Sequence, residues 1–194
     1  MKVIVTGASG FVGHRVVKEL LRRGVKTCAV ARHPVEFPDS VVVDNYFDTP
    51  SGDVLIHLAE NPNRAQVNEI GSAYLCEAGA LANSLVSKGY QRIVFASSAV
   101  VYGDKDKRRH KPMDPVLATD VYSQSKLECE MLFDKNNGVI ARISNLYGVG
   151  MSTENVFSKI IQQVRCAGEV KVWNDKPIRD FLWVDDAVDA LVEM

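Results

Sequence analysis

Tyr122 and Lys126 are the residues whose types and spacing most directly suggest catalysis. They stand four positions apart in the segment YSQSK, so on a helix both side chains project from one face. A free phenol ionises only near pH ~10 and is a weak base at neutral pH. An adjacent ammonium stabilises the phenolate, and such a pair can move a proton between a hydroxyl and a ketone. Because this spacing also arises by chance on many helices, it needs support from other residues.

Two serines give that support. Ser97 and Ser98 open the segment SSAVVYG, which follows the apolar run Arg92–Ser97, a pattern typical of a strand. Open parallel sheets bind ligands beyond the carboxyl ends of their strands. A hydroxyl placed there can hydrogen-bond a substrate oxygen and stabilise its developing charge. The serines could instead be plain turn residues, but the accompanying motifs favour an active site.

Three glycines near the start of the chain indicate a phosphate-binding turn. Gly7, Gly10 and Gly13 are spaced by three, between a predicted strand and a predicted helix. Such glycines let the turn tighten, let the backbone approach a pyrophosphate and let the helix pack closely on the sheet. The helix N-terminus then faces the phosphates. An ordinary glycine-rich turn is the alternative, but its place in a first βαβ unit favours a dinucleotide site.

The end of the second predicted strand bears on the choice of cofactor. NAD-selective sites usually place an acid here to hold the ribose 2′-hydroxyl. This chain has Ala31-Arg32-His33 instead, and an arginine suits a 2′-phosphate, which slightly favours NADP over NAD. The alternative is that Arg32 is simply a surface residue. Asp44, after the third predicted strand, is a candidate to contact the adenine.

A parallel sheet is needed to position these residues. The apolar runs are continuous and alternate with helical patterns, as expected of strands covered on both faces. The expected strands are Lys2–Thr6, Val25–Ala31, Val41–Val43, Asp53–Leu58, Arg92–Ser97 and Val139–Ser144. The expected helices are one that starts near Val12 and closes at Gly24, one over about Gln66–Lys88 and one over about Val121–Asp134. The sequence therefore predicts an α/β fold, a Rossmann-type doubly wound parallel sheet flanked by helices.

The chain changes character after Gly150. Residues 1–150 are expected to form the dinucleotide-binding domain that carries the catalytic residues. Residues 151–194 are expected to add a helix over Glu154–Ala167, a strand over Val170–Trp173 and the start of a further helix. This is too little for an independent domain, and we interpret it as a partial, apparently truncated substrate lobe.

Composition narrows the class of protein. The 194 residues carry a formal net charge of -1, so no electrostatic argument favours nucleic acid or an anionic membrane as a partner. The 4 cysteines are scattered without a CxxC pair, which argues against a metal site or a disulfide framework and fits reduced thiols. No apolar run is long enough to span a bilayer, and no signal-peptide pattern opens the chain. We therefore expect a soluble, cytoplasmic protein.

Taken together, these motifs resemble a known family, the extended short-chain dehydrogenase/reductases, and within it the nucleotide-sugar epimerase/dehydratase group. The resemblance covers nearly the whole chain, with the segments in family order. They are TGASGFVG (Thr6–Gly13), DVLIHLA (Asp53–Ala59), NEIG (Asn68–Gly71), SSAVVYGD (Ser97–Asp104), YSQSK (Tyr122–Lys126), RISNLYGVG (Arg142–Gly150) and RDFLWVDD (Arg179–Asp186). Any one of them is weak, but together they are specific.

The resemblance implies roles for individual residues. Tyr122 would be the acid/base, and Lys126 its partner and a ribose ligand. Ser98 would contact the substrate hydroxyl, because it lies four residues before Tyr102, as the family's active serine or threonine does. Substrate binding is also implied for Asn145 and Arg179, although a structural ion pair is an equal alternative for the arginine. The implied cofactor-binding residues are Gly7, Ser9, Gly10, Phe11, Val12, Arg32, Asp44, Leu58, Ala59, Asn68, Ala96, Tyr122 and Lys126.

The resemblance also bears on the reaction. Dehydratases of the group follow the active threonine with an Asp-Glu pair, whereas this chain has Ala99-Val100, which disfavours dehydration. The stretch SAVVYGD is most similar to hexose 4-epimerases. In those enzymes the tyrosine removes a hydroxyl proton while hydride moves to the nicotinamide, and the ketone is then reduced from its other face. The expected function is an NAD(P)-dependent nucleotide-sugar epimerase.

Two alternatives remain open. One is an NADPH-dependent reductase of a keto-sugar or other carbonyl, which Arg32 favours. The other is a non-catalytic dinucleotide-binding regulatory or scaffold protein, which the presence of Ser98, Tyr122 and Lys126 disfavours.

The chain departs from the family pattern between its fourth strand and the next helix. The segment His57–Asn68 is shorter than usual, and Glu60 replaces the small residue common after HLA. The resemblance also implies a partner, because family members commonly dimerise through two helices per subunit. Here these would be Gln66–Lys88 and Val121–Asp134, so a homodimer is expected.

Overall fold

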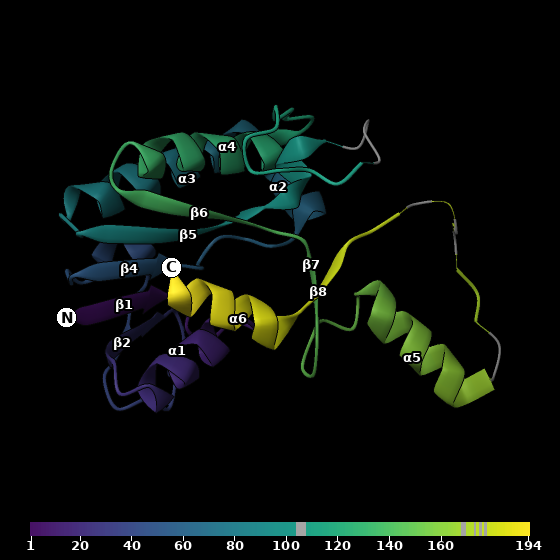
Figure 1. Cartoon of the computed structure of the whole chain (residues 1–194), viewed down its shortest axis with the longest axis horizontal. Helices are drawn as coiled ribbons and strands as arrows, with labels where there is room; N and C mark the ends of the chain where they lie inside the picture. Colours follow the sequence, from purple (N-terminus) through teal and green to yellow (C-terminus); the bar gives the residue numbers. More distant parts are fainter. Residues whose placement is uncertain (104–107, 168–169, 173, 175, 177) are drawn as a thin grey trace.

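Six parallel strands form the centre of the protein. The computed structural model describes residues 1–103, 108–167, 170–172, 174, 176 and 178–194. The sheet has the order β3-β2-β1-β4-β5-β6, and each neighbouring pair runs parallel (Figure 1). The strands are β1 (Lys2–Thr6), β2 (Lys26–Ala31), β3 (Ser40–Val42), β4 (Val54–His57), β5 (Arg92–Ser98) and β6 (Gly138–Ile143). All the strands predicted for this sheet are confirmed, with ends shifted by no more than a single residue.

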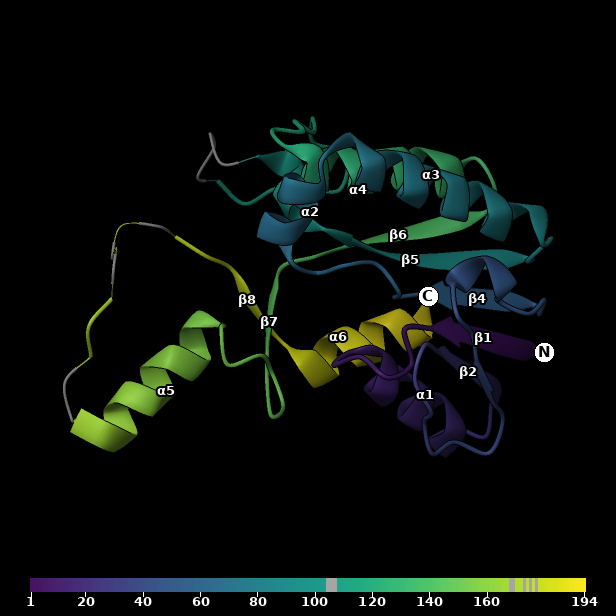
Figure 2. The ribbon, with the colours of Figure 1, turned by 180° about the vertical axis from the view of Figure 1, so that it is seen from behind.

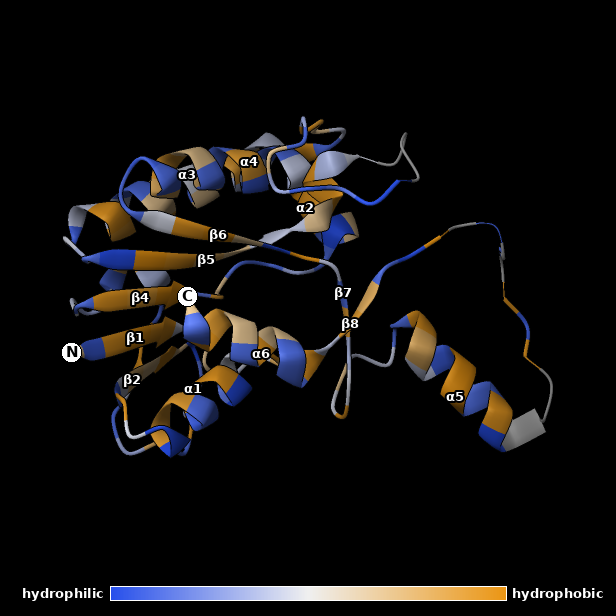
Figure 3. Cartoon of the chain, viewed as in Figure 1, coloured by the Kyte–Doolittle hydropathy of each residue, from blue (hydrophilic) through white to orange (hydrophobic). Residues whose placement is uncertain are grey.

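Helices cover both faces of the sheet, as predicted. They are α1 (Gly13–Arg22), α2 (Arg64–Ile70), α3 (Ser72–Ser87), α4 (Val121–Asp134) and α6 (Val184–Glu193). Figures 1 and 2 show α1 and α6 together on one face, with α3 and α4 on the other. Val17 and Val188 belong to the apolar cluster on the first face, and Leu85 and Phe133 to the cluster on the second. The strands are mostly apolar, whereas α1 and α6 each carry a polar outer side (Figure 3). The fold is therefore the predicted doubly wound, Rossmann-type sheet.

Helix α4 has the bounds that the sequence predicted, because Asp120 caps it. The Asp120 carboxylate accepts a hydrogen bond from the backbone amide of Ser123 at 2.9 Å. The Ser123 hydroxyl in turn accepts one from the backbone amide of Asp120 at 3.1 Å. This reciprocal capping box fixes the first turn of the helix, from which Tyr122 projects.

The helix predicted over Gln66–Lys88 is wrong in one respect: it is two helices. Gly71 separates α2 from α3 with a φ of 72°, in the left-handed region that favours glycine. The amide of Gly71 still bonds to the carbonyl of Val67, so α2 ends in a closed turn. The break lets α2 approach the N-terminus of α4 independently of α3.

The C-terminal part contains a second, two-stranded sheet. Strands β7 (Asn145–Tyr147) and β8 (Phe181–Trp183) pair in parallel, and α5 (Val156–Ala167) lies between them in sequence and apart from the main sheet in space (Figure 1). The strand predicted over Val170–Trp173 is wrong for residues 170–172, which have no regular structure, and Trp173 is outside the described residues. The helix predicted over Glu154–Ala167 is confirmed from Val156 onward.

Aromatic rings join α5 to the small sheet. The Tyr147 ring lies 4.9 Å from that of Phe157, and the Phe157 ring lies 4.5 Å from that of Phe181. These contacts could not be read from local sequence pattern, which explains why neither β7 nor β8 was predicted. Within the described ranges, no helix has both the length and the apolar character needed to cross a bilayer.

Candidate active site

The glycine turn after β1 is too tight to hold side chains. Gly7 has a φ of +71°, and a Cβ built on it would lie 2.7 Å from the carbonyl oxygen of Leu58. A Cβ on Gly13 would lie 2.1 Å from the carbonyl oxygen of Gly7, and the Gly10 amide closes the turn on that same carbonyl at 2.9 Å. The first and third glycines are therefore required by close backbone contacts, as the sequence predicted.

The turn presents free backbone donors at the start of α1. The amides of Ser9, Phe11 and Val12 donate to no acceptor among the residues that the structure describes. Unbonded N–H groups at a helix N-terminus, together with the helix dipole, favour an anionic ligand. These donors fit the pyrophosphate of a dinucleotide, which could approach the turn because its glycines add no side-chain bulk.

The end of β4 lies directly beside this turn. The Thr6 hydroxyl is 2.7 Å from Nδ1 of His57 and accepts a hydrogen bond from the Leu58 amide at 3.2 Å. The Cβ position of Gly7 would lie 3.1 Å from the Cα of Ala59. The structure thus brings Leu58 and Ala59, two of the predicted cofactor-binding residues, against the glycine turn.

Arg32 and Asp44 are both exposed, and they follow β2 and β3 at the edge where the parallel strands end. The Arg32 guanidinium lies 5.9 Å from the centroid of the Tyr46 ring. A guanidinium over an aromatic face is held in a cation–π contact and keeps its N–H donors available. The placement suits the adenosine end of a dinucleotide.

Tyr122 and Lys126 lie on α4, which packs against β5. The Lys126 ammonium is 5.8 Å from the centroid of the Tyr122 ring and donates a hydrogen bond to the carbonyl oxygen of Ala96 at 2.9 Å. Ala96 is near the carboxyl end of β5, and the short helix Ala99–Tyr102 after this strand also packs against α4. The structure therefore brings Tyr122, Lys126 and the end of β5 together.

The two serines at the end of β5 have different environments. Ser97 is buried, and its hydroxyl donates to the carboxylate of Glu130. Glu130 in turn pairs with Arg142, whose Nη2 lies 2.7 Å from the carboxylate. The Ser98 hydroxyl is only partly buried and accepts a long hydrogen bond, 3.3 Å, from the amide of Val100. The Ser98 hydroxyl is therefore the more accessible of the two, and its assignment as the active serine stays a prediction.

The Asn68 side chain forms hydrogen bonds to the start of α4. Its side-chain oxygen accepts a hydrogen bond from the Tyr122 amide at 3.0 Å, and its amide nitrogen donates to Asp120 at 3.0 Å. Arg64 pairs with the same carboxylate. Burial raises the pKa of Asp120, but hydrogen bonds from Ser123, Asn68 and Arg64 outweigh it and hold that pKa well below its usual range.

The two other residues predicted to bind substrate, Asn145 and Arg179, lie at or near the small sheet. The Asn145 side chain donates to the carbonyl oxygen of Asp180 at 3.0 Å, which ties β7 to the segment before β8. Arg179 is exposed and forms no ion pair with any residue that the structure describes; its Nη1 donates to the carbonyl of Ile178. Within the described residues, Arg179 therefore remains available to a ligand.

Glu60 is the site residue that sequence reasoning missed. Its carboxylate forms an ion pair with Lys126, and both side chains are only 8% exposed. The sequence contained a signal, because Glu60 was noted as a departure from the family's small residue. Nothing in its local pattern pointed to Lys126 as the partner.

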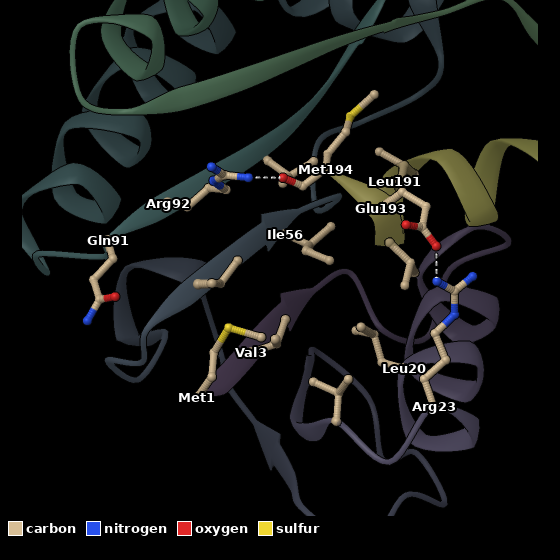
Figure 4. Close-up of a pocket in the computed structure, with 14 residues that line it drawn as sticks. Met1, Val3, Leu20, Arg23, Ile56, Gln91, Arg92, Leu191, Glu193 and Met194 are labelled. Carbon is tan, nitrogen blue, oxygen red and sulfur yellow. Dashed lines mark hydrogen bonds and ion pairs between the residues drawn. The ribbon is translucent and has the colours of Figure 1, made fainter.

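A cavity of about 550 Å³ lies elsewhere, at the starts of the strands (Figure 4). Apolar side chains such as Val3, Ile56 and Leu191 dominate its wall. Arg92 at its rim donates to the carbonyl of Met194, and Arg23 pairs with Glu193 (Figure 4). This cavity is at the opposite end of the sheet from Tyr122, so it is separate from the candidate active site.

Two curated proteins are similar to this chain over all or most of its length. UDP-glucuronic acid decarboxylase 1 of Arabidopsis thaliana is 26% identical over 231 residues, which align with 100% of this chain and 52% of that protein. UDP-glucose 4-epimerase of Halalkalibacterium halodurans is 26% identical over 151 residues, 69% of this chain and 45% of its own. The chain thus spans about half the length of these curated relatives.

The same likeness extends to solved structures and to the family level. MoeE5, solved in complex with UDP-glucuronic acid and NAD, superposes with a TM-score of 0.81 at 29% identity, over 98% of this chain and 71% of its own. The model of the NAD dependent epimerase/dehydratase family matches residues 3–194. The resemblance read from the motifs is confirmed, and the chain belongs to the NAD-dependent epimerase/dehydratase family, a group of extended short-chain dehydrogenase/reductases.

Proposed function

We infer that this chain carries the catalytic residues of a nucleotide-sugar epimerase that works through a transient keto-sugar. The observation that carries this proposal is the placement of Lys126. Its ammonium lies 5.8 Å from the Tyr122 ring and is fixed at the end of β5 by the Ala96 carbonyl. A phenol with a cation beside it, combined with a serine hydroxyl at the ligand edge of a parallel sheet, is suited to interconvert a hydroxyl and a ketone.

Each residue of the site has a distinct task in this proposal. Tyr122 takes the proton from a sugar hydroxyl and later returns it, while Lys126 stabilises the phenolate and holds the ribose of the cofactor. Ser98 donates its hydroxyl hydrogen to the substrate oxygen as that oxygen gains charge. The amides at the glycine turn hold the pyrophosphate. A bound dinucleotide would supply the hydride acceptor and donor for this interconversion.

The residues after Ser98 favour epimerisation over elimination. Ala99 and Val100 carry no acid or base, and Val101, the next residue, is fully buried. Elimination of water needs a group to take a proton from carbon and a group to protonate the leaving hydroxyl. Among the relatives, the bacterial UDP-glucose 4-epimerase supports the same reaction class and a nucleotide-sugar as the substrate.

The choice between NAD and NADP rests on Arg32. NAD is the cofactor in the structure of MoeE5. In this chain the exposed Arg32 guanidinium, held over Tyr46, is suited to a 2′-phosphate, and we propose NADP as the preferred form. Arg32→Ala should weaken NADP binding by about tenfold or more and leave NAD binding nearly unchanged, because only NADP offers the extra phosphate.

An NADPH-dependent carbonyl reductase is the second candidate, favoured by the same arginine. The two functions differ in what becomes of the cofactor. An epimerase regenerates it in every turnover, and the purified protein should contain oxidised cofactor. A reductase consumes NADPH in proportion to product.

The test combines product analysis with one matched pair of variants. Purified protein is incubated with UDP-glucose, UDP-galactose and UDP-glucuronic acid, and the sugar nucleotides are separated and quantified alongside NADPH absorbance. Tyr122→Phe should lower the epimerisation rate about 10²- to 10⁴-fold, because it removes the acid/base group. Tyr90→Phe removes a phenol whose hydroxyl donates to the Pro50 carbonyl and should leave the rate unchanged. Full activity in Tyr122→Phe would refute the mechanism, whereas no conversion by the unmodified protein would favour the non-catalytic alternative.

The organisation of the chain follows from the same proposal. We propose that residues 1–150 bind the dinucleotide and carry catalysis, and that Arg179, within residues 151–194, binds the sugar nucleotide together with Asn145 of the first segment. We also propose that the protein is a cytoplasmic homodimer that pairs through α3 and α4. Light scattering on the purified protein tests the dimer.

A further inference from the structure

Glu60 and Lys126 form a nearly dry ion pair behind the candidate catalytic tyrosine. The Glu60 carboxylate contacts the Lys126 ammonium, and each side chain is only 8% exposed. The same ammonium donates to the Ala96 carbonyl at 2.9 Å and lies 5.1 Å from the centroid of the Phe95 ring. The cation, which projects from α4, is therefore held between β5 and the segment that follows β4.

Among the residues that the structure describes, the other titratable groups that face this pair supply no second fixed charge. Tyr74, from α3, has a pKa raised by burial to about 12, and the pKa of the Cys129 thiol is likewise raised by burial. Burial lowers the pKa of His57 to about 4, so its ring is neutral near pH 7. The titratable and charged groups around the pair are His57 on β4, Tyr74 on α3, and Tyr122 and Cys129 on α4.

Without a counter-ion, a lysine in this position would tend to lose its proton. Burial lowers the pKa of Lys126, but the Glu60 carboxylate, together with Tyr122 and Tyr74, outweighs burial and leaves that pKa raised. An ion pair this deep is weak evidence for stability, because desolvation of both charges cancels much of their attraction. The ion pair involves the lysine that faces Tyr122, so its role concerns the chemistry of the site rather than the stability of the fold.

The segment that carries Glu60 is anchored so that its side chain stays in place. The backbone amide of Asn61 donates to the Tyr74 hydroxyl at 3.1 Å, which ties the segment to α3. Asn63 then caps α2 by accepting from the Gln66 amide. Only a short stretch separates β4 from α2, so Glu60 has little freedom to move away from Lys126.

We propose that Glu60 is the counter-ion that keeps Lys126 protonated and places its ammonium beside Tyr122, and thus acts as a positioning residue of the site. The role in catalysis rests on the proposed function, whereas the effect on the charge of Lys126 does not. Glu60 acts through Lys126 and does not itself touch the substrate.

The test measures the charge state of Lys126 without requiring turnover. Protein with ¹³C at the Cε of its lysines is titrated with base and followed by NMR, and the Lys126 signal is assigned by its loss in Lys126→Arg. In Glu60→Gln the Lys126 signal should titrate about one to three pH units lower than in the wild type, because burial then acts unopposed. Glu69→Gln, which removes the same charge from an exposed site on α2, should leave the midpoint unchanged. An identical midpoint in Glu60→Gln and the wild type overturns the proposal.

A second variant covers the case in which Glu60→Gln does not fold. Glu60→Asp keeps the charge but draws it back by one methylene, so the Lys126 midpoint should fall by a smaller amount; an unchanged midpoint overturns the proposal here too. In an active enzyme, the alkaline limb of the kcat/KM profile should shift to lower pH in Glu60→Gln alone. A lower Lys126 midpoint in a protein that converts no sugar nucleotide supports the counter-ion and counts only against the epimerase.

Discussion

The side-chain oxygen of Asn68 accepts a hydrogen bond from the backbone amide of Tyr122 at 3.0 Å. That amide is one of the donors at the start of α4 that has no partner within the helix. The same side chain also donates to Asp120, the residue that caps α4. Asn68 therefore links α2 to the turn from which the candidate catalytic phenol projects.

We expect Asn68→Ala to impair catalysis more than folding. Loss of the link frees the first turn of α4, and a displacement of Tyr122 on the order of 1 Å can lower kcat about tenfold to a hundredfold. The free energy of unfolding should fall by only about 1 kcal/mol for the lost hydrogen bonds. Steady-state kinetics and urea denaturation measure the two effects. Asn83→Ala, which removes a hydrogen bond from an exposed side chain of α3 to the Gly79 carbonyl, is the control and should leave kcat intact.

Ser97 and Ser98 should respond to alanine in opposite ways. Ser98→Ala removes a donor to the developing charge and should lower kcat about 10²- to 10³-fold with little loss of stability. Ser97→Ala leaves Glu130 without its buried hydroxyl partner, so the free energy of unfolding should fall by about 1–3 kcal/mol while kcat stays within severalfold. Thermal unfolding and kinetics on both variants decide the assignment. A larger loss of kcat in Ser97→Ala would mean that the roles are reversed.

Features of the site that depend on local pattern were predictable from the sequence. The bounds of α4 follow from the Asp120–Ser123 capping box, and the i, i+4 spacing places Tyr122 and Lys126 on one face. The glycine turn follows in the same way, because Gly7 and Gly13 each meet backbone atoms where a side chain would clash. In both cases, the contacts that determine the local structure join residues close in the sequence, or they lie at a strand end whose position follows from the topology of the sheet.

Other features depend on contacts between distant segments and were missed. Helix α2 was merged with α3 because suitable helix formers stand on both sides of Gly71, and only its positive φ separates them. Strand β7 is three residues long and is defined by pairing with β8, which no local pattern encodes. The Glu60–Lys126 pair joins the segment after β4 to the middle of α4. Because these residues are far apart in the chain, the sequence showed that Glu60 is unusual but not that it pairs with Lys126.

Gly13→Ala should abolish binding of the dinucleotide. Its Cβ would lie 2.1 Å from the Gly7 carbonyl oxygen, so the turn and the start of α1 would have to separate. Calorimetry with NAD and NADP should detect no binding, and the melting temperature should fall by several degrees, because strain of this kind costs about 1–3 kcal/mol. In Gly79→Ala, whose Cβ meets only the Glu128 carboxylate at 3.9 Å, stability should be equal or higher by up to about 1 kcal/mol. Wild-type affinity in Gly13→Ala would exclude the turn as the pyrophosphate site.

The buried His57 should make the protein less stable as the pH falls below about 6.5. Burial lowers the pKa of His57 from 6.5 to about 4 in the folded state, so between these values the unfolded chain binds a proton that the native protein excludes. The stability contributed by the neutral ring is complete above the unfolded value and decreases by up to about 3 kcal/mol as the pH approaches 4.

His57→Asn removes this titration while keeping a polar group near the Thr6 hydroxyl, which lies 2.7 Å from Nδ1 in the native protein. The variant should be less stable at neutral pH, because a smaller side chain leaves unfilled space beside Phe95 and Phe133, whose ring centroids lie 6.0 and 5.9 Å from that of His57. Its free energy of unfolding, measured by urea denaturation from pH 8 to pH 4, should nevertheless fall less steeply than that of the wild type below pH 6.5, with the two curves parallel above about pH 7.5. Curves that stay parallel down to pH 4 would show that the ring is protonated as readily in the folded protein as in the unfolded chain.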